Sequence, residues 1–364
     1  MGADAAQGGG AVPDRAAAAP RQWLQRRPVH GLLLLDKALG ASSNQALQRA
    51  KWLLRADKAG HTGTLDPLAS GLLPLCFGAA TKFSQLQLDA DKVYAATLHL
   101  GLRTSSGDAE GEVLERRPVA CTPAQVQQVL ARFLGTISQV PPMYSALKHQ
   151  GRALYEYARA GLEVERAPRR VSIHVLELLA LALEGPEPAL RLRVHCSKGT
   201  YIRSLAEDIG AALGCGAHLS ALRRLRSGSL GLERSLTLEQ LEALPESARL
   251  RALLPVDALL AGHERVTLDD DNAARFLTGL RRRGPWPDGE RVAVYAASSA
   301  SAVPAASAAS APSGPQPTAL LGSAQIVGGE LIPGRLLSPI EIQQITLQNL
   351  HEHSDTQHRH HRPR

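Results

Sequence analysis

The sequence predicts an α+β protein whose central sheet is mixed and largely antiparallel, with helices packed beside it. Segments with strand-like and helix-like apolar spacing both occur, and they lack the regular strand–helix alternation of a parallel α/β protein. The 364 residues are enough for two domains with a substantial core. With 44% hydrophobic and 21% charged residues, the composition is that of an ordinary globular chain.

Strands are predicted where apolar residues form a short unbroken run or alternate with polar ones. Residues 32–35 are four leucines that lead into a polar turn, as in a short buried strand. In Lys92–Leu100, the side chains at positions 94, 96, 98 and 100 share one face. The segments 171–175 and 190–196 alternate in the same way, which predicts two further strands.

Helices are predicted from capping signals followed by apolar residues at helical spacing. Ser42 and Gln45 have the spacing of a capping box, and the helix that follows should end near residue 55. Thr122 and Pro123 place a cap and a proline at the start of a second helix. Residues 201–213 return to helical spacing and predict a third.

Changes in composition divide the chain into segments. Residues 1–28 are rich in Ala, Gly, Pro and Arg without an apolar signal core, and are expected to be disordered. A main domain should cover 29–262, and a smaller unit of short strands 263–345. The smaller unit contains an Ala/Ser/Pro stretch at 296–319, which we expect to be a flexible insertion. The His-rich tail at 346–364 is expected to be a disordered, solvated tract and not a metal site.

Charge and cysteine usage indicate the kind of partner and the compartment. The formal charge of +7 and the pI near 9.5 suit a polyanionic partner such as nucleic acid or an acidic membrane. The four cysteines have neither CxxC nor zinc-ligand spacing, so reduced thiols in the cytoplasm are expected. Apolar runs are far too short to cross a bilayer, and no membrane association is expected.

The stretch with the most chemical potential is GHTGTLDPLASG at 60–71. Its glycines permit a shaped loop, which gathers one imidazole, two threonine hydroxyls and the carboxylate of Asp66. Asp66 could merely cap a helix that begins at Pro67 and continues over 67–73. The local sequence contains neither a second acid nor a phosphate-binding loop. A lone carboxylate suits nucleophilic or base chemistry on a substrate that carries its own leaving group.

Several long motifs, in order, closely resemble the tRNA pseudouridine-55 synthases of bacteria, the TruB family. The loop at 60–71 resembles the family's catalytic-aspartate motif. The other matching stretches are GLLLLDK at 31–37, SSN at 42–44, ATKFSQ at 80–85, DKVY at 91–94, PPMYSALKHQGRALYEYARAG at 141–161, HCSKGTYIRSL at 195–205 and GCGAHLSALRRLRSG at 214–228. The resemblance is dense over 31–228 and looser beyond.

This resemblance implies a fold, an activity and a partner. The fold would be that of the pseudouridine synthases, followed by a small C-terminal PUA-like β-barrel that contacts tRNA. The enzyme would isomerise uridine-55 in the T-loop of tRNA by base flipping, as a cytoplasmic monomer without a metal, an organic cofactor or an obligatory protein partner. The segment at about 136–170 would clasp the RNA.

The resemblance also lends roles to four residues around the reaction. Asp66 matches the catalytic aspartate, which would attack C1′, attack C6 or withdraw a ribose proton. Tyr94 matches a tyrosine that stacks on the target base, although its strand position alone indicates a core residue. Tyr201 and Arg203 match the tyrosine and arginine that approach the carboxylate.

Three more residues are matched in supporting roles. His61 matches a histidine that takes the place of the flipped base, and Leu222 matches an apolar wall of the nucleotide pocket. Lys37 matches a lysine that supports the catalytic loop. The proline that usually follows this lysine is replaced by Ala38, which should leave the loop less rigid.

Other assignments stay open at this point. Basic residues are candidates for phosphate contact, although such charges often mark a solvated face: Lys148, Arg152, Arg159, Arg169, Arg170, Arg223, Arg224 and Arg226. The alternatives to a tRNA pseudouridine synthase are a non-catalytic tRNA-binding or tRNA-folding protein, and a synthase that acts on another RNA. A hydrolase using His61 and Asp66 ranks last, because no nucleophile or metal set accompanies them.

Overall fold

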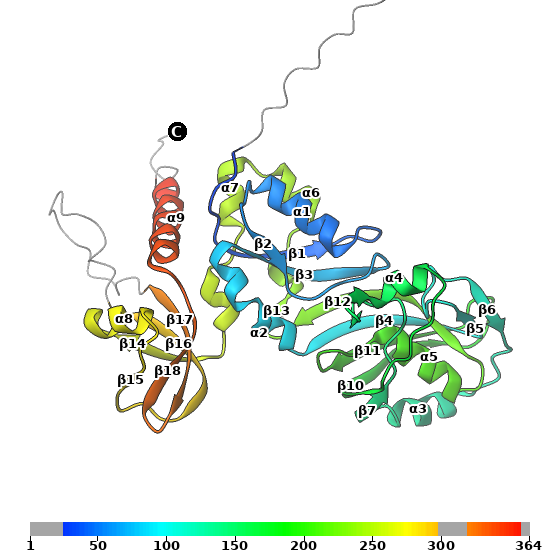
Figure 1. Ribbon diagram of the computed structural model, residues 1–364. Helices are drawn as coiled ribbons and strands as arrows, with labels where there is room; N and C mark the ends of the chain where they lie inside the picture. The colour runs from blue at the N-terminus through cyan, green and yellow to red at the C-terminus, as the bar shows by residue number, and fades with distance from the viewer. Residues whose placement is uncertain (1–24, 298–318, 358–364) are drawn as a thin grey trace, which may run out of the picture.

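The computed structural model describes residues 25–297 and 319–357 of the chain. They form a large unit built around one long sheet and a smaller C-terminal unit beside it (Figure 1). Within these residues, no helix combines the length and apolarity needed to cross a membrane.

The main sheet contains nine strands and is largely antiparallel. The order along it is β1-β3-β12-β4-β11-β10-β7, with β2 paired to β3 and β13 to β12; only β3 and β12 run parallel. Its strands are β1 (Gly31–Lys37), β2 (Ala59–His61), β3 (Ala69–Phe77), β4 (Lys92–Leu100), β7 (Gly135–Gln139), β10 (Arg169–Ala182), β11 (Ala189–Cys196), β12 (Ala217–Ser227) and β13 (Leu230–Gly231). The mixed, largely antiparallel sheet expected from the sequence is confirmed.

Short helices and hairpins flank this sheet. The helices are α1 (Ser43–Leu53), α2 (Ser84–Asp89), α3 (Pro123–Ala131), α4 (Leu154–Arg159), α5 (Ile202–Ala212), α6 (Leu238–Ala243) and α7 (Glu246–Arg251), with 3₁₀ turns η1 (Gly78–Phe83), η2 (Leu232–Arg234) and η3 (Val256–Leu260). The hairpins pair β5 (Leu102–Thr104) with β6 (Val113–Arg116), and β8 (Lys148–His149) with β9 (Arg152–Ala153). The capping boxes predicted at Ser42 and Thr122 are both present.

Two apolar clusters of the large unit meet at the middle of the sheet. Helices α3 and α5 pack on β4, β10 and β11 in the first cluster, and α1 packs on β1 and β3 in the second. Tyr94 on β4 and Leu222 on β12 contact both clusters. The two side chains therefore lie at the junction of the two halves, which is also where the catalytic-loop motif enters the sheet.

The prediction of a helix that begins at Pro67 is wrong, because residues 69–77 form the buried strand β3. The run Leu72–Phe77 is fully buried, and periodicity alone cannot tell such a strand from a buried helix. Gly71 shows the constraint that favours a strand over a helix in this run. This residue has φ +98° and lies so close to β12 that a Cβ atom would sit 2.3 Å from the carbonyl oxygen of Arg224. The loop is thus joined to the sheet by a residue that must be glycine.

The C-terminal unit is a curled five-stranded sheet in the order β14-β16-β17-β18-β15, which matches the expected PUA-like fold (Figure 1). Its elements are β14 (Glu264–Leu268), α8 (Asp270–Leu277), β15 (Arg282–Arg283), β16 (Gly289–Ala296), β17 (Leu320–Val327), β18 (Glu330–Leu336) and α9 (Pro339–Gln357). The insertion expected at 296–319 lies outside the described residues except at its ends. There the amide of Ala296 donates to the carbonyl of Ala319 at 2.9 Å.

At both ends of the described region, the structure extends into segments that the sequence predicted to be disordered. The amide of Arg27 pairs with the carbonyl of Arg55, inside the segment expected to be disordered. The helix α9 continues to residue 357, inside the expected tail, and residues 358–364 lie outside the described part. Tertiary contacts explain α9: His30 hydrogen-bonds Gln344 and Gln348 of this helix, through side chain and backbone. Composition alone does not reveal such contacts across more than 300 residues.

Lys92 provides a test of the packing behind β4. Its Nζ atom donates to the carbonyls of Gln87, Leu88 and Ala90, and burial, assisted by Arg224, lowers its pKa to about 8. An unfolded lysine has a pKa of about 10.4, so between these values the unfolded chain binds one more proton than the folded protein. The contribution of Lys92 to the free energy of unfolding therefore rises with pH across this window.

We expect Lys92→Met to flatten this rise in denaturant unfolding measured between about pH 7.5 and pH 10.5. Lys148→Met, at an exposed lysine, serves as the control and should keep the slope of the parent protein. A slope that is unchanged in Lys92→Met would contradict the lowered pKa.

Candidate functional site

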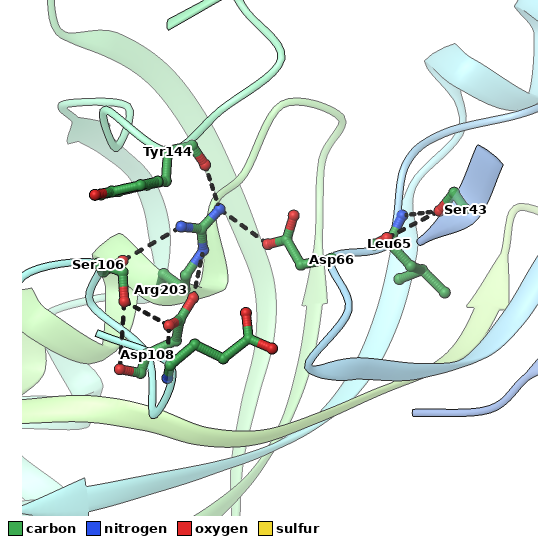
Figure 2. A network of polar contacts seen from close by, with 8 residues as sticks. Ser43, Leu65, Asp66, Ser106, Asp108, Tyr144 and Arg203 are labelled. Atoms are coloured by element: carbon green, nitrogen blue, oxygen red, sulfur yellow. Dashed lines mark hydrogen bonds and ion pairs between the residues drawn. The ribbon is translucent and has the colours of Figure 1, made fainter. Parts of the chain in front are cut away.

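Asp66 and Arg203 form an ion pair at the centre of the site. Oδ2 of Asp66 lies 2.9 Å from Nη2 of Arg203, which comes from the first turn of α5 (Figure 2). The arginine side chain is 6% exposed, whereas the aspartate side chain is 44% exposed. Oδ1 of Asp66 has no hydrogen-bond partner within the described part of the chain. The pair thus combines a buried, fixed cation with a carboxylate that keeps one oxygen accessible.

The cation is held from the other side by Asp108, which the sequence analysis did not single out. Nε of Arg203 lies 3.6 Å from Oδ2 of Asp108, and both side chains are 6% exposed. The remaining guanidinium hydrogens reach the carbonyls of Tyr144 at 2.7 Å and Ser106 at 3.3 Å (Figure 2). Asp108 is itself fixed by the Ser106 hydroxyl and the amide of Glu110. Arg203 lies 95 positions from Asp108 in the chain, so no local spacing could have revealed this ion pair.

The position of Asp66 is set by Ser43, the first residue of α1. The Ser43 hydroxyl accepts from the amide of Leu65 at 2.7 Å and donates to the carbonyl of the same residue at 2.9 Å (Figure 2). On the other side of the aspartate, the amide of Gly40 donates to the carbonyl of Pro67 at 2.9 Å. Both neighbours of Asp66 are therefore tied to the segment that leads into α1.

Lys37 supports this segment from within. Its Nζ atom donates to the carbonyls of Ala38 and Ala41 at 2.9 and 2.7 Å, and the residue is 1% exposed. Burial lowers the pKa of Lys37, while the nearby charge of Asp66 acts in the opposite direction. The lysine reaches the catalytic loop indirectly, because it orders the turn whose Gly40 amide holds Pro67.

Two tyrosines lie within the electrostatic reach of Asp66. Burial is the main cause that raises the pKa of Tyr94, which Asp66 raises further and Arg224 opposes. Burial likewise raises the pKa of Tyr201, and Asp66 adds to that rise. Both phenols are therefore neutral at physiological pH. Leu222 lies two residues before Arg224 on β12 and pairs with Ala69 of β3, so it borders the same loop.

The segment after β7 is fastened to α5. The Gln139 side chain accepts from the amide of Tyr201 at 3.1 Å and donates to its carbonyl at 3.3 Å. One turn further, the Ser204 hydroxyl donates to the carbonyl of Val140 at 3.0 Å. With the contact between Arg203 and Tyr144, three successive anchors place the start of the segment expected to clasp RNA directly beside the charge pair.

His61 ends strand β2 and is partly buried. Burial and, secondarily, Arg224 lower its pKa, so the imidazole is uncharged at neutral pH. Its Nδ1 atom is shielded and has no hydrogen-bond partner in the described structure. A neutral ring of this kind suits insertion among bases better than contact with a phosphate.

Arg224 is corrected from a phosphate candidate to a structural residue, whereas Arg223 remains a phosphate candidate because its side chain is 42% exposed. Arg224 is 1% exposed, and its guanidinium donates to the carbonyls of Leu72 at 2.7 Å and Gly63 at 3.4 Å. It thereby fixes the loop that carries His61 and Asp66. Arg223 makes two hydrogen bonds, of 2.7 and 3.0 Å, to the carboxylate of Asp36. An alternating strand pattern would have indicated that one of two adjacent arginines points inward.

The remaining phosphate candidates lie on the surface. They are Lys148, Arg152, Arg159, Arg169, Arg170 and Arg226, all of which are exposed. Arg152 and Arg159 stack over the rings of Tyr157 and Tyr155 at 4.8 and 5.3 Å. Their charge and aromatic neighbours are compatible with RNA contact.

Comparisons with known families define the scaffold as that of a pseudouridine synthase. No group of three or more His, Cys, Asp or Glu residues suited to a metal ion occurs among residues 25–297 and 319–357. The model of the TruB family pseudouridylate synthase N-terminal domain matches residues 51–202, and that of the tRNA pseudouridylate synthase B C-terminal domain matches 203–261. The chain therefore belongs to the TruB family of pseudouridylate synthases.

Individual relatives agree with this assignment, and solved structures agree with the fold. The chain is 60% identical over 330 residues to the tRNA pseudouridine synthase B of Verminephrobacter eiseniae, covering 90% of this chain and 94% of the relative. It is 57% identical over 314 residues to that of Ralstonia pickettii, covering 86% and 95%. Among solved structures, a Cbf5–Nop10–Gar1 complex matches with a TM-score of 0.61 and 26% identity, covering 90% and 93%. The chain in an H/ACA ribonucleoprotein bound to a substrate RNA matches with a TM-score of 0.59 and 24% identity, covering 86% of each.

The role of Asp108 can be tested by Asp108→Asn. Removing one of two carboxylates around a buried guanidinium leaves its charge less compensated, and Arg203 should then shift toward Asp66. We expect a fall in kcat of about tenfold or more, with KM nearly unchanged, because the Asp108 side chain is 6% exposed and would act through Arg203 and not by touching the substrate. Asp208→Asn, at an exposed position of α5, is the matched control. A parental kcat in Asp108→Asn would show that the Asp66–Arg203 pair is sufficient alone.

Proposed function

We propose that this protein is a tRNA pseudouridine synthase that converts uridine-55 in the T-loop of tRNA to pseudouridine. The observation that carries the proposal is the half-exposed Asp66, which has one oxygen fixed at 2.9 Å from a buried arginine and the other available to a substrate. The names of the relatives, tRNA pseudouridine synthase B, support tRNA as the substrate class.

The reaction is an isomerisation, so the nucleotide shows no net gain or loss of atoms or electrons. The N1–C1′ bond of uridine breaks, the uracil turns, and a C5–C1′ bond forms while the proton on C5 is lost and N1 gains one. The reacting atoms are buried in a stacked RNA loop, so the nucleotide must first be extruded at a cost of a few kcal/mol. Protein groups that replace the lost stacking lower this cost.

The residues around Asp66 fit these demands. Tyr94 would stack on the extruded uracil, with Leu222 as an apolar wall and Tyr201 beside the carboxylate. The uncharged imidazole of His61 would fill the space that the base leaves in the RNA loop. Arg203 keeps Oδ2 of Asp66 in place, so Oδ1 would act on C1′ or C6, or would accept a ribose proton.

The parts of the chain divide the work of binding. In this proposal, residues 29–262 form the catalytic domain, the 136–170 segment clasps the RNA beside α5, and residues 263–345 make a second contact with tRNA. Three anchors between the start of that segment and α5 support the arrangement. We propose that the protein acts as a cytoplasmic monomer, without a metal ion, an organic cofactor or a protein partner.

The decisive experiment uses purified protein and a bare tRNA transcript in a chelator, with pseudouridine located by mass spectrometry. We expect conversion at position 55 by the parent protein. In Asp66→Asn, conversion should fall by several orders of magnitude while tRNA binding remains, because the amide can neither attack nor accept a proton. Asp57→Asn, at an exposed loop position, should behave like the parent.

Each rival makes a different forecast for this assay. If the chain is a non-catalytic tRNA-binding protein, neither the parent nor Asp66→Asn should form pseudouridine. The cellular phenotype of Asp66→Asn should then be the same as that of the parent. A synthase for another RNA predicts modification of ribosomal RNA fragments in place of the transcript. Near-parental activity of Asp66→Asn would refute the site.

A further inference from the structure

An exposed tryptophan on α1 has no role in the site described above. Aromatic residues make up only 4% of the chain, and Trp52 is 54% exposed. The buried face of α1 comprises Ser43, Ala46, Leu47, Ala50 and Leu53, so the indole points away from the core. The guanidinium of Arg49 lies over the ring, 4.6 Å from its centre. The ring is thus open to solvent beside a cation, and is available for stacking against a partner.

Positive charge surrounds this ring. Arg26, Gln48, Lys51, Trp52 and Arg55 line a small cavity of about 70 Å³, and with Arg49 they are named here the Trp52 patch. Two of its cations are compensated: Arg49 pairs with Glu242, and Arg55 with Glu246 at 3.2 Å. Arg26 and Lys51 form no ion pair within the described part of the chain. The patch therefore offers unneutralised cations next to an aromatic face.

The same helix connects the patch to Asp66. Ser43, at the start of α1, holds the residue next to Asp66, and Trp52 follows nine positions later. At 1.5 Å per residue this separation is about 14 Å along the helix axis. A B-form duplex covers this distance in about four base pairs, and an A-form RNA duplex, which rises less per base pair, needs about one more. An RNA that extended from Asp66 in the direction of α1 would therefore reach the patch within a few base pairs.

We propose that the Trp52 patch is a second RNA-binding surface, on which Trp52 stacks against an unpaired base while Arg26 and Lys51 contact the flanking phosphates. The proposal rests on the function proposed above and adds a contact outside the catalytic cluster. Two features favour RNA over a protein partner. The cavity is small and three of its lining residues, Arg26, Lys51 and Arg55, are cations, which suits a phosphate better than an apolar anchor residue. The surplus charge of the patch is positive.

Binding measurements on the full-length protein test the stacking contact. Trp52→Ala should weaken tRNA binding about tenfold, because the protein can no longer stack on that base, while kcat at saturating tRNA stays unchanged. Leu114→Ala, at an apolar residue of β6 that is also exposed (62%), is the control and should bind as the parent does.

The proposed phosphate contacts of Arg26 and Lys51 are tested separately, through the salt dependence of tRNA binding. The double variant Arg26→Glu, Lys51→Glu should reduce the slope of log Kd against log salt by about two, one unit for each phosphate that the protein no longer neutralises. Arg132→Glu, at the exposed arginine that follows the last turn of α3, should leave that slope near the parental value.

A spectroscopic readout locates the base. The chain has three tryptophans, so the double variant Trp23→Phe, Trp286→Phe leaves Trp52 as the single indole. Addition of tRNA should quench its fluorescence.

If tRNA is modified normally, yet neither quenching nor a weaker affinity in Trp52→Ala is seen, the proposal is wrong and a protein partner becomes the explanation of the patch. If the parent protein modifies no tRNA but quenching by RNA persists, the proposed function fails and the RNA-binding surface stands.

Discussion

The buried charge of Arg203 is the constraint on which the site depends. A guanidinium that is 6% exposed must be compensated where it lies, and Asp66, Asp108 and two backbone carbonyls do so from three separate segments. The two carboxylates are not equivalent, since Asp108 is as buried as the arginine whereas Asp66 is half exposed. One acid therefore stabilises the cation, and the other is left available for chemistry. The same cation holds the segment around Tyr144, so this segment and Asp66 share one anchor.

Hydrogen bonds that fix the backbone near Asp66 and Arg203 complement this charge pair. Ser43 and Gln139 each use one side chain to satisfy both the amide and the carbonyl of a single residue, Leu65 and Tyr201 respectively. Each of these residues stands one or two positions from a member of the charge pair. Because the serine and the glutamine are 2% exposed, water does not compete for these bonds. The fold therefore holds Asp66 and Arg203 in place without a ligand, and in the proposed function this would reduce the entropy lost on binding.

Sequence patterns predicted what depends on local spacing and missed what depends on distant contacts. The capping boxes at Ser42 and Thr122 and the strand Lys92–Leu100 follow from residues within a few positions of each other. Motif resemblance supplied Asp66 and Arg203, which the fold brings together although 137 positions separate them. Asp108 was missed because nothing near it in the chain reveals a partner on α5. Arg224 was assigned to the surface because net charge does not show which of two adjacent arginines on a strand faces inward.

The hydrogen bond between Ala296 and Ala319 has a consequence for the evolution and engineering of this chain. The two stems of the Ala/Ser/Pro stretch meet at the end of an antiparallel pair, so the sheet closes at their junction whatever the intervening length. For a flexible loop, doubling that length costs only about 0.6 kcal/mol in closure entropy. We therefore expect this junction to accept longer, shorter or foreign sequence, including a fluorescent reporter, without a change in the strands that it joins.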